Sequence, residues 1–250
     1  MANDPAHVMA IMQPYFFPYL GYFQLINQVE NFIFHDNVQY IKAGWINRNR
    51  ILRARKGVWL SFPVLAAPHT RSIDQRFYQP TISNKLRLLH AIKQSYCKSP
   101  YFSEIFPLLQ QIMSFNDANV ANFNINLICR LAQHLKISSK FIRASDMVPN
   151  NSLKGQARVI DLCQRSGAKR YINPIGGTKL YQSSAFAEAG IDLGFLKPTI
   201  AEYQQFDPVF VPDLSIIDVM MFNHPEQIAV MLNQCQLMLP MTSGHEPGSG

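Results

Sequence analysis

Residues 9–40 read MAIMQPYFFPYLGYFQLINQVENFIFHDNVQY, and this stretch decides the fold that the sequence predicts. The apolar run at residues 8–12 is typical of a buried strand, and residues 31–35 form a second such run. Between the two runs, Gly21 opens a segment whose apolar residues recur at roughly helical spacing. Strand, turn, short helix and strand in this order predict a βαβ unit, which pairs the two strands in parallel through a right-handed crossover.

Polar side chains follow both strands of this unit. Gln13 and Tyr15 come after the first strand, and His35 and Asp36 come at the end of the second. Because ligands of such units bind at the carboxyl ends of the strands, we expect these side chains at one site. A histidine beside a carboxylate is a reasonable acid–base pair, since the carboxylate raises the proton affinity of the imidazole. The alternative is a plain turn, in which the backbone satisfies His35 and Asp36 only shapes the turn.

The rest of the chain alternates between helical and strand patterns. Apolar residues recur at spacings of three and four over about residues 83–136, which predicts a helical layer. Strand and helix patterns then alternate up to residue 198, with Gly167 and Gly190 ending the two helices. Residues 215–234 read as terminal helices. The predicted fold is therefore α/β, with a mainly parallel sheet and helices on its faces.

The domain organisation follows from the same patterns. We expect a single α/β domain over residues 1–241, with the helical subdomain at about 83–136, because no long linker separates two parts. Residues 242–250 are polar and rich in glycine, and they are expected to form a disordered tail. Residues 58–64 read as a strand, and Pro63 indicates a sheet edge or a strand end.

Composition limits the classes of function. Hydrophobic residues make up 48% and charged residues 16% of the chain, which is typical of a globular protein. The net charge of +7 favours anionic partners such as nucleotide sugars, phospholipid surfaces or RNA. The sequence shows neither a signal peptide nor an apolar run of membrane-spanning length, so a cytoplasmic protein without integral membrane association is expected. The four scattered cysteines are expected to be reduced packing residues. The sequence lacks the ligand spacing of a zinc site, so no metal binding is expected.

A second cluster of candidate binding residues is Trp45, Asn47 and Arg48. The guanidinium of arginine suits a two-pronged contact with phosphate or carboxylate, and asparagine adds a neutral donor and acceptor. The tryptophan ring offers a face for stacking. We interpret Asn47 and Arg48 as anion-binding residues, whereas the neighbouring cations up to Lys56 read as a solvated basic loop.

A glycine pair marks a third candidate. Gly176 and Gly177 follow a predicted strand and stand before Tyr181, so their backbone amides could approach an anion. A tight turn explains the pair almost as well. The spacing matches neither the GxGxxG fingerprint nor a P-loop. Residues 154–158, which include Lys154 and Arg158, open the preceding helix in a similar way with a weaker signal.

Ser215 and Asp218 form the fourth candidate. Serine is a favoured residue at the start of a helix, so Ser215 is predicted to cap the helix that contains Asp218. Asp218 stands among apolar residues, and burial of an unpaired carboxylate is costly. We therefore expect Asp218 to meet a cation or an amide, with Arg48 as one conceivable partner.

Three segments resemble the WbqC-like family found among bacterial O-antigen genes. They read MQPYFFPYLGYFQLI (12–26), HDNVQYIKAGWINRNRI (35–51) and SIIDVMMFN (215–223), so the likeness covers most of the chain. The resemblance implies transfer of glycine or another amino acid onto a sugar of a surface polysaccharide such as lipopolysaccharide. It favours His35 as the base, oriented by Asp36, and it includes Tyr40 among the binding residues.

The resemblance also implies the partners. An anionic small molecule, most simply a nucleotide sugar, would be the acceptor. The sequence does not identify the aminoacyl donor, which could be a free amino acid with ATP, an aminoacyl-tRNA or an acyl carrier, and it assigns no cofactor. Nucleic acid enters only if the donor is an aminoacyl-tRNA.

The opening unit further resembles the nucleotidyltransferase superfamily, which has a Rossmann-like fold. The segment FPYLGYFQLI is similar to the turn that carries the HxGH motif, although Tyr19 and Tyr22 replace both histidines. DNVQY is similar to the segment after the second strand of pantothenate synthetase. Because those histidines help to hold a triphosphate, the replacements predict weak ATP binding. They also favour an alternative function, a non-catalytic protein that binds a nucleotide sugar or RNA.

Overall fold

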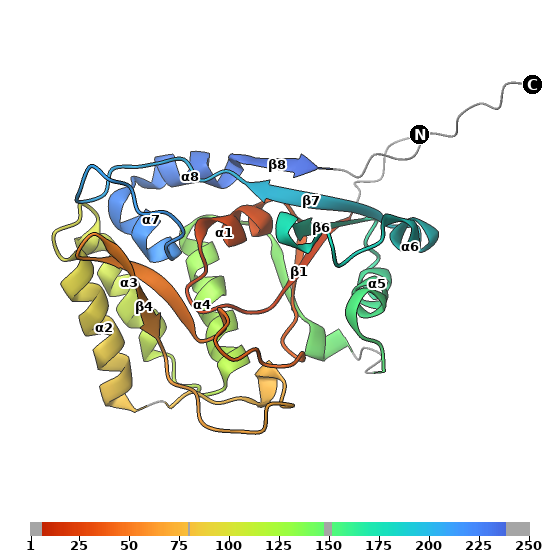
Figure 1. Ribbon diagram of the computed structural model, residues 1–250, viewed down its shortest axis with the longest axis horizontal. Coiled ribbons are helices and arrows are strands. Elements are labelled where there is room, and N and C mark those ends of the chain that lie inside the picture. The colour runs from red at the N-terminus through yellow and green to blue at the C-terminus, as the bar shows by residue number, and fades with distance from the viewer. Residues whose placement is uncertain (1–6, 80, 148–151, 239–250) are drawn as a thin grey trace, which may run out of the picture.

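The computed structural model describes residues 7–79, 81–147 and 152–238, which form an α/β protein around a six-stranded sheet (Figure 1). The strands pair in the order β5-β2-β1-β6-β7-β8; all neighbours are parallel except β7 and β8. Their bounds are β1 Val8–Met12, β2 Asn31–Phe34, β5 Lys140–Arg143, β6 Arg170–Pro174, β7 Asp192–Pro198 and β8 Cys235–Met238. The predicted α/β class and the opening βαβ unit are confirmed.

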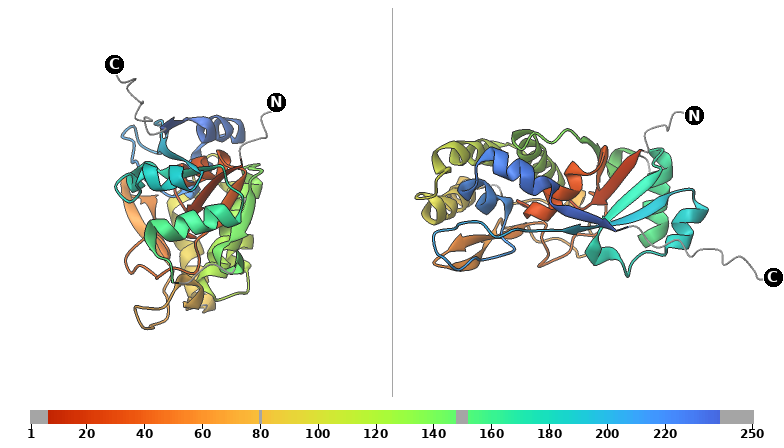
Figure 2. Two further views of the ribbon diagram at one scale, coloured as in Figure 1. Left: turned by 90° about the vertical axis from the view of Figure 1, so that its right-hand side faces the viewer. Right: turned by 90° about the horizontal axis from the view of Figure 1, so that it is seen from above.

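The helices cover both faces of this sheet. From above, α5 and α6 lie at one end of the molecule and α2 and α3 at the other (Figure 2). The helical stretch predicted in the middle of the chain is confirmed as α2, α3 and α4. The bounds are α1 Leu20–Asn27, α2 Ile82–Tyr96, α3 Phe102–Ser114, α4 Val120–His134, α5 Gly155–Arg165, α6 Ser183–Glu188, α7 Ile216–Phe222 and α8 Pro225–Asn233.

Strand order explains why the helices divide between the faces. The chain moves from β1 outward to β2 and β5, then returns to the other side of β1 for β6 and β7. Because parallel crossovers are right-handed, the reversal of direction puts α1 on one face and α5 and α6 on the other. The switch in direction lies between β1 and β6, and the carboxyl ends of the strands form the edge where ligands of such folds bind.

Alternating side chains of the strands supply two separate cores. Ala10 and Phe32 belong to the larger core, which contains α1 and the middle helices. Met9 and Ile33 point the other way and pack with residues of α5 and α6. This alternation is the two-residue period of a strand, and it explains why both strands are apolar throughout: both faces of the sheet are covered.

Two pairs of strands differ from the sequence-based expectation. The predicted strand at 58–64 is β4 (Lys56–Ser61), which pairs antiparallel with β3 (Arg48–Arg53) as a hairpin separate from the main sheet. The hairpin turn at Ala54 and Arg55 has positive φ at both residues, a geometry for which the sequence Asn-Gly is strongly preferred. Because that signal is missing, the sequence did not predict β3.

The end of the described chain also differs. The helical pattern ends with α8 at Asn233, and β8 then adds antiparallel to the edge of β7. The predicted helix ends at Gly167 and Gly190 are confirmed, with φ of 69° and 72°. The expected tail at 242–250 lies outside the described residues. Within the described ranges no helix is long and apolar enough to cross a membrane.

Candidate functional site

A pocket of about 950 Å³ opens at the carboxyl edge of the sheet, where β2, β5 and the start of α5 meet. Its polar lining comes from the loop after β2, from the turn near residue 72, from the segment after β5 and from α5. These residues are His35, Asn37, Gln39, Ser72, Asp74, Gln75, Ser145, Lys154, Gln156, Arg158 and Tyr181. His35 and Tyr181, which the sequence singled out for the site, therefore meet here with Lys154 and Arg158, which carried a weaker signal.

Arg158 is the partner of His35 in this pocket. Its guanidinium is almost fully buried, and Nε donates a hydrogen bond of 3.2 Å to Nε2 of His35. Nη2 of the same side chain donates to the side-chain oxygen of Asn37 at 2.9 Å. Arg158 thus joins the start of α5 to the loop that follows β2.

Burial and the neighbouring guanidinium lower the pKa of His35 from 6.5 to about 4. Asp36 acts in the opposite direction but does not outweigh these two causes. The imidazole is therefore neutral near pH 7. Because Nε2 accepts from Arg158, the proton of the neutral ring resides on Nδ1.

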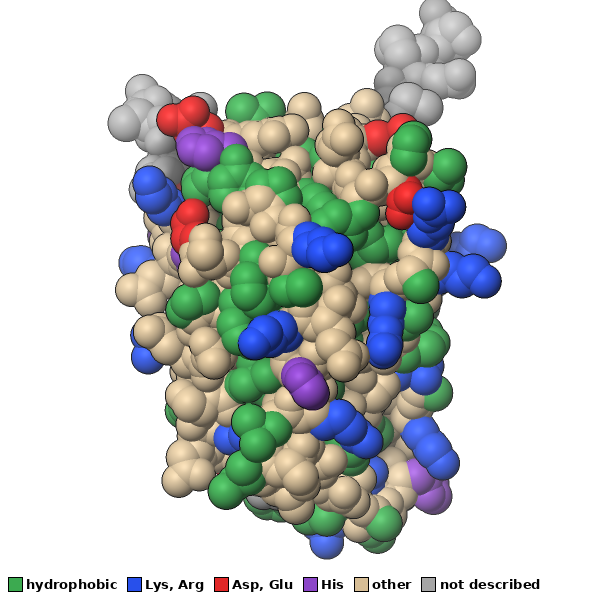
Figure 3. All heavy atoms as spheres, turned by 90° about the vertical axis from the view of Figure 1, so that its left-hand side faces the viewer, with side chains coloured by type: hydrophobic (Ala, Val, Ile, Leu, Met, Phe, Trp, Pro, Cys, Tyr) green, Lys and Arg blue, Asp and Glu red, His purple; other side chains and the backbone are tan. Residues whose placement is uncertain are grey.

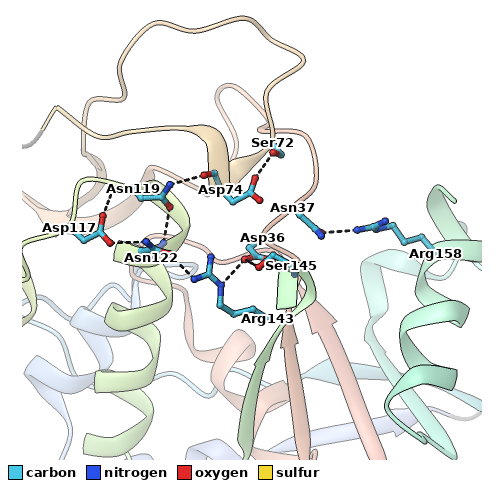
Figure 4. A network of polar contacts seen from close by, with 10 residues as sticks. All are labelled: Asp36, Asn37, Ser72, Asp74, Asp117, Asn119, Asn122, Arg143, Ser145 and Arg158. Atoms are coloured by element: carbon cyan, nitrogen blue, oxygen red, sulfur yellow. Dashed lines mark hydrogen bonds and ion pairs between the residues drawn. The ribbon is translucent and has the colours of Figure 1, made fainter. Parts of the chain in front are cut away.

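Asp36 contacts Arg143 and Ser145 in a network of polar side chains (Figure 4). Its fully buried carboxylate accepts from Nε of Arg143 at 2.8 Å, and from the backbone amide and hydroxyl of Ser145 at 3.0 and 2.7 Å. The described contacts therefore give His35 a different partner from the expected one, Arg158 instead of Asp36. The carboxylate of Asp36 instead fixes the loop after β2 to the segment after β5.

The network continues through α4 to the turn near residue 72. Nη1 of Arg143 donates to the side-chain oxygen of Asn122 at 2.8 Å, and Asn122 donates to Asp117 at 2.7 Å. Asn119, which caps α4, donates to the backbone oxygen of Asp74 at 2.7 Å (Figure 4). These contacts hold one wall of the pocket against the helical layer.

The residues singled out between Tyr40 and Arg48 form a second group outside the pocket. The hydroxyl of Tyr40 donates to the side chain of Asn47 at 2.8 Å. The Arg48 guanidinium donates to the carbonyls of Gly44 and Ala43. This second group does not line the pocket that contains His35, so the structure does not bring His35, Asn47 and Arg48 to one cleft.

Aromatic rings complete this second group. The guanidinium of Arg48 lies 4.1 Å from the ring centroid of Trp59, and that ring is 5.5 Å from the ring of Trp45. Stacking of this kind stabilises a cation on an aromatic face. Arg48 is thus engaged by its own loop and the hairpin, and its expected role in anion binding stays a prediction.

The residues after β1 lie close to the core. The backbone oxygen of Gln13 accepts from the hydroxyl of the fully buried Tyr22 at 2.9 Å, and the ring of Tyr15 is 5.6 Å from that of Tyr22. Burial raises the pKa of Tyr15 above its ordinary value. Tyr19 precedes α1, and its ring lies over Gly21 so closely that an added Cβ there would stand 2.5 Å from it. Tyr22 is therefore a packing residue of the core, and the half-buried Tyr19 packs on Gly21.

The glycine pair follows β6 in a short helical turn. A Cβ on the buried Gly177 would stand 1.8 Å from the side-chain nitrogen of Asn173, whereas a Cβ on Gly176 would meet open space. Close approach to Asn173 thus explains Gly177. Tyr181 lies further along and lines the pocket with its ring 5.6 Å from that of Phe186.

Asp218 is buried in α7 and meets three neutral groups. Its carboxylate accepts from the hydroxyls of Tyr96 and Tyr203 at 2.9 and 2.6 Å and from the amide of Gln205 at 2.8 Å. Burial raises the pKa of Asp218, and the three hydrogen bonds partly offset that effect. The amide partner was expected, but the suggested pairing with Arg48 is wrong because these three groups surround the carboxylate instead.

Ser215 caps α7 as the sequence predicted. Its hydroxyl accepts from the backbone amide of Ile217 at 3.3 Å and donates to the carbonyl of Phe17 at 2.8 Å. The cap therefore also ties α7 to the turn that follows β1.

Sequence reasoning gave too little weight to Arg158 and missed Arg143. One signal could have identified Arg158: it shares the buried face of α5 with Val159, Leu162 and Cys163, where a charged residue is costly unless it is paired. When a helix follows a strand, an arginine on its apolar face is a candidate to bind a ligand or to pair with a buried polar group. Across the described ranges, no group of three or more His, Cys, Asp or Glu side chains could hold a metal ion.

Fold and pocket together define an α/β protein with a doubly wound, mainly parallel sheet and a polar pocket at its carboxyl edge, whose lining includes Lys154, Arg158 and Asp74. The chain belongs to the WbqC-like protein family, whose model matches residues 13–230. It is also similar to a protein of Mycobacterium tuberculosis that is described only as uncharacterized, with 27% identity over 232 residues, 91% of this chain and 98% of that protein. No solved structure matches the chain.

Proposed function

We propose that the pocket around His35 and Arg158 binds an anionic acceptor, a nucleotide sugar, and that the protein transfers an aminoacyl group such as glycyl onto its sugar. The observation that carries this proposal is the buried guanidinium of Arg158 at the pocket wall, in contact with the neutral ring of His35. Lys154 adds a second cation. Guanidinium and ammonium groups beside neutral donors suit a phosphate.

The hydrogen bond between Arg158 and His35 provides a way for ligand binding to prepare the base. A phosphate that attracts the guanidinium of Arg158 removes the donor from Nε2 of His35. It also cancels part of the positive charge that lowers the pKa of His35. Both changes make Nε2 a better proton acceptor, as general base catalysis requires.

In the chemical step, His35 is the single group that takes up and returns a proton. An amine or hydroxyl of the sugar attacks the carbonyl carbon of an activated aminoacyl donor, and Nε2 takes the proton of the attacking atom. The bond between the carbonyl carbon and the leaving group breaks, and the imidazolium returns the proton to that group. In this mechanism Asp36 is a positioning residue, because its carboxylate contacts Arg143 and Ser145.

A second candidate function is binding of a nucleotide sugar or RNA without catalysis. It is favoured by the packing of Tyr22, whose hydroxyl is bonded to the backbone of Gln13 and is fully buried. Tyr22 stands where the nucleotidyltransferase motif has a histidine, so no triphosphate contact is expected from it. Titration calorimetry with ATP and magnesium should then give no binding heat, and tight binding would argue for an adenylating enzyme.

Thermal stabilisation by a library of nucleotide sugars tests the proposal, because a ligand that binds the folded state raises the unfolding temperature. We expect a nucleotide sugar to stabilise the wild-type protein and Lys169→Ala, an exposed change far from the pocket. Lys154→Ala should weaken the stabilisation, since Lys154 is exposed and lines the pocket. Equal stabilisation of all three proteins would place the ligand elsewhere.

Catalysis is tested separately on the ligand identified in this way. His35→Gln keeps a neutral side chain with a hydrogen-bond acceptor but cannot carry the proton. It should retain nucleotide-sugar binding and lose aminoacyl transfer. Binding without any transfer by the wild-type protein, with each of the three classes of donor supplied, would favour the non-catalytic function.

A further inference from the structure

Positive charge is concentrated in one part of the chain. Residues 37–103 contain twelve Lys and Arg and one acidic residue, Asp74. The remaining residues contain eleven Lys and Arg and fifteen Asp and Glu. The whole excess of positive charge therefore comes from this segment, which builds the hairpin β3–β4 and α2.

Three of these cations line a groove of about 840 Å³ along α2. The apolar part of its lining includes Leu86, Leu89 and Phe106. The basic residues that line it are Arg53, Arg87, His90 and Lys93. Among the residues that the structure describes, no acidic side chain lines the groove.

The outer side of α2 carries large aliphatic side chains as well as cations. Ile82 is 78% exposed and Leu86 is 59% exposed, although Leu88 and Ile92 on the opposite side of the helix are buried. Figure 3 shows this side of the molecule: basic and hydrophobic side chains are interspersed on it, and the acidic side chains lie in its upper part. We call the surface formed by Arg53, Ile82, Leu86, Arg87, His90 and Lys93 the α2 face.

We propose that the α2 face docks on an anionic lipid membrane. Arg53, Arg87 and Lys93 would contact lipid phosphates, while Ile82 and Leu86 would enter the boundary between headgroups and acyl chains. A helix that carries both basic and exposed aliphatic side chains binds an anionic bilayer through charge attraction and burial of apolar surface. The membrane is thus bound at its surface, without a spanning helix.

Two features favour a bilayer over RNA. Leu86, Leu89 and Phe106 line the groove beside the cations, and these apolar side chains offer no hydrogen bond to a phosphate backbone. The α2 face also exposes the large side chains of Ile82 and Leu86, and aliphatic groups contribute little to contacts with phosphates or bases. The pocket around His35 shares no residue with the α2 face, so this proposal does not depend on the proposed function.

Sedimentation of the full chain with lipid vesicles tests the proposal. The protein should bind vesicles that mix phosphatidylglycerol with phosphatidylcholine, and should not bind vesicles of phosphatidylcholine alone. Arg87→Ala and Lys93→Ala should each lower the partition coefficient about fivefold at low salt, with a smaller effect at high salt. Leu86→Ser should lower the partition coefficient at both salt concentrations, because its contact is apolar.

Lys169→Ala is the matched control, since it removes an exposed cation outside the α2 face. It should bind as the wild-type protein does, and all variants should keep the wild-type unfolding temperature. The proposal is overturned if anionic vesicles are not bound, if Lys169→Ala weakens binding as much as Arg87→Ala, or if Leu86→Ser has no effect. RNA binding that needs Arg87 and Lys93, without vesicle binding, would assign the face to nucleic acid instead.

Discussion

Replacement of Arg143 by methionine should destabilise the protein strongly, because it leaves the carboxylate of Asp36 buried without its cation. Asp36 is fully buried, and its ion pair with Arg143 has an N–O distance of 2.8 Å. Methionine keeps much of the length of the side chain, so little packing is lost. Ser145 would still donate two hydrogen bonds to the carboxylate.

The magnitude follows from the cost of breaking a buried ion pair, which is about 3–5 kcal/mol. Arg143 is itself 32% exposed, so water can reach the vacated position, and we take the lower end, about 3 kcal/mol. For a chain of 250 residues this corresponds to a fall of roughly 6–12 °C in the unfolding temperature. The loss of the contact to Asn122 acts in the same direction.

Urea unfolding followed by circular dichroism measures the change in the free energy of unfolding. Arg165→Met is the control: its pair with Asp161 lies on the surface of α5, and the unfolding midpoint should stay where it was. The double variant Asp36→Asn with Arg143→Met should recover part of the loss, because the buried charge is gone. A loss below about 1 kcal/mol for Arg143→Met would refute the reasoning that Asp36 depends on this cation.

Three further changes probe the site. The pKa of His35 is about 4 in the folded protein and 6.5 in the unfolded chain. The unfolded chain therefore takes up the proton first, and the stability of the folded protein should fall as pH drops from about 6.5 towards 4. The unfolding temperature of His35→Gln should depend less on pH across that range than that of the wild-type protein. Gly177→Ala should cost about 1–3 kcal/mol in urea unfolding because its Cβ would strike Asn173, and Gly176→Ala should be nearly neutral; equal effects would contradict the close approach. Arg48→Lys should lower the unfolding temperature, because lysine cannot reproduce the fork to two carbonyls; an unchanged unfolding temperature would contradict this structural role, and a loss of nucleotide-sugar affinity would support the anion-binding role expected from the sequence.

The sequence by itself determined the architecture. Apolar runs, helical periodicity and two helix-ending glycines predicted the βαβ unit, the mainly parallel sheet, the helical stretch and the caps at Gly167, Gly190 and Ser215. These features are local: a strand or helix shows its buried side through spacing, and a cap needs only its neighbours in the chain. The hairpin turn at Ala54 and Arg55 was not predicted from the sequence, because alanine and arginine rarely adopt positive φ.

Only the tertiary structure decided how the candidate residues pair. His35 and Asp36 are adjacent in the chain, yet His35 bonds with Arg158, 123 residues away, and Asp36 with Arg143, 107 residues away. Successive residues at the end of a strand point in different directions, so their partners depend on which elements the strand order places on each side. β5 lies beside β2 and contributes Arg143, whereas α5 crosses the opposite face and contributes Arg158. Spacing along the chain carries no record of that juxtaposition, because it arises only when the sheet is assembled.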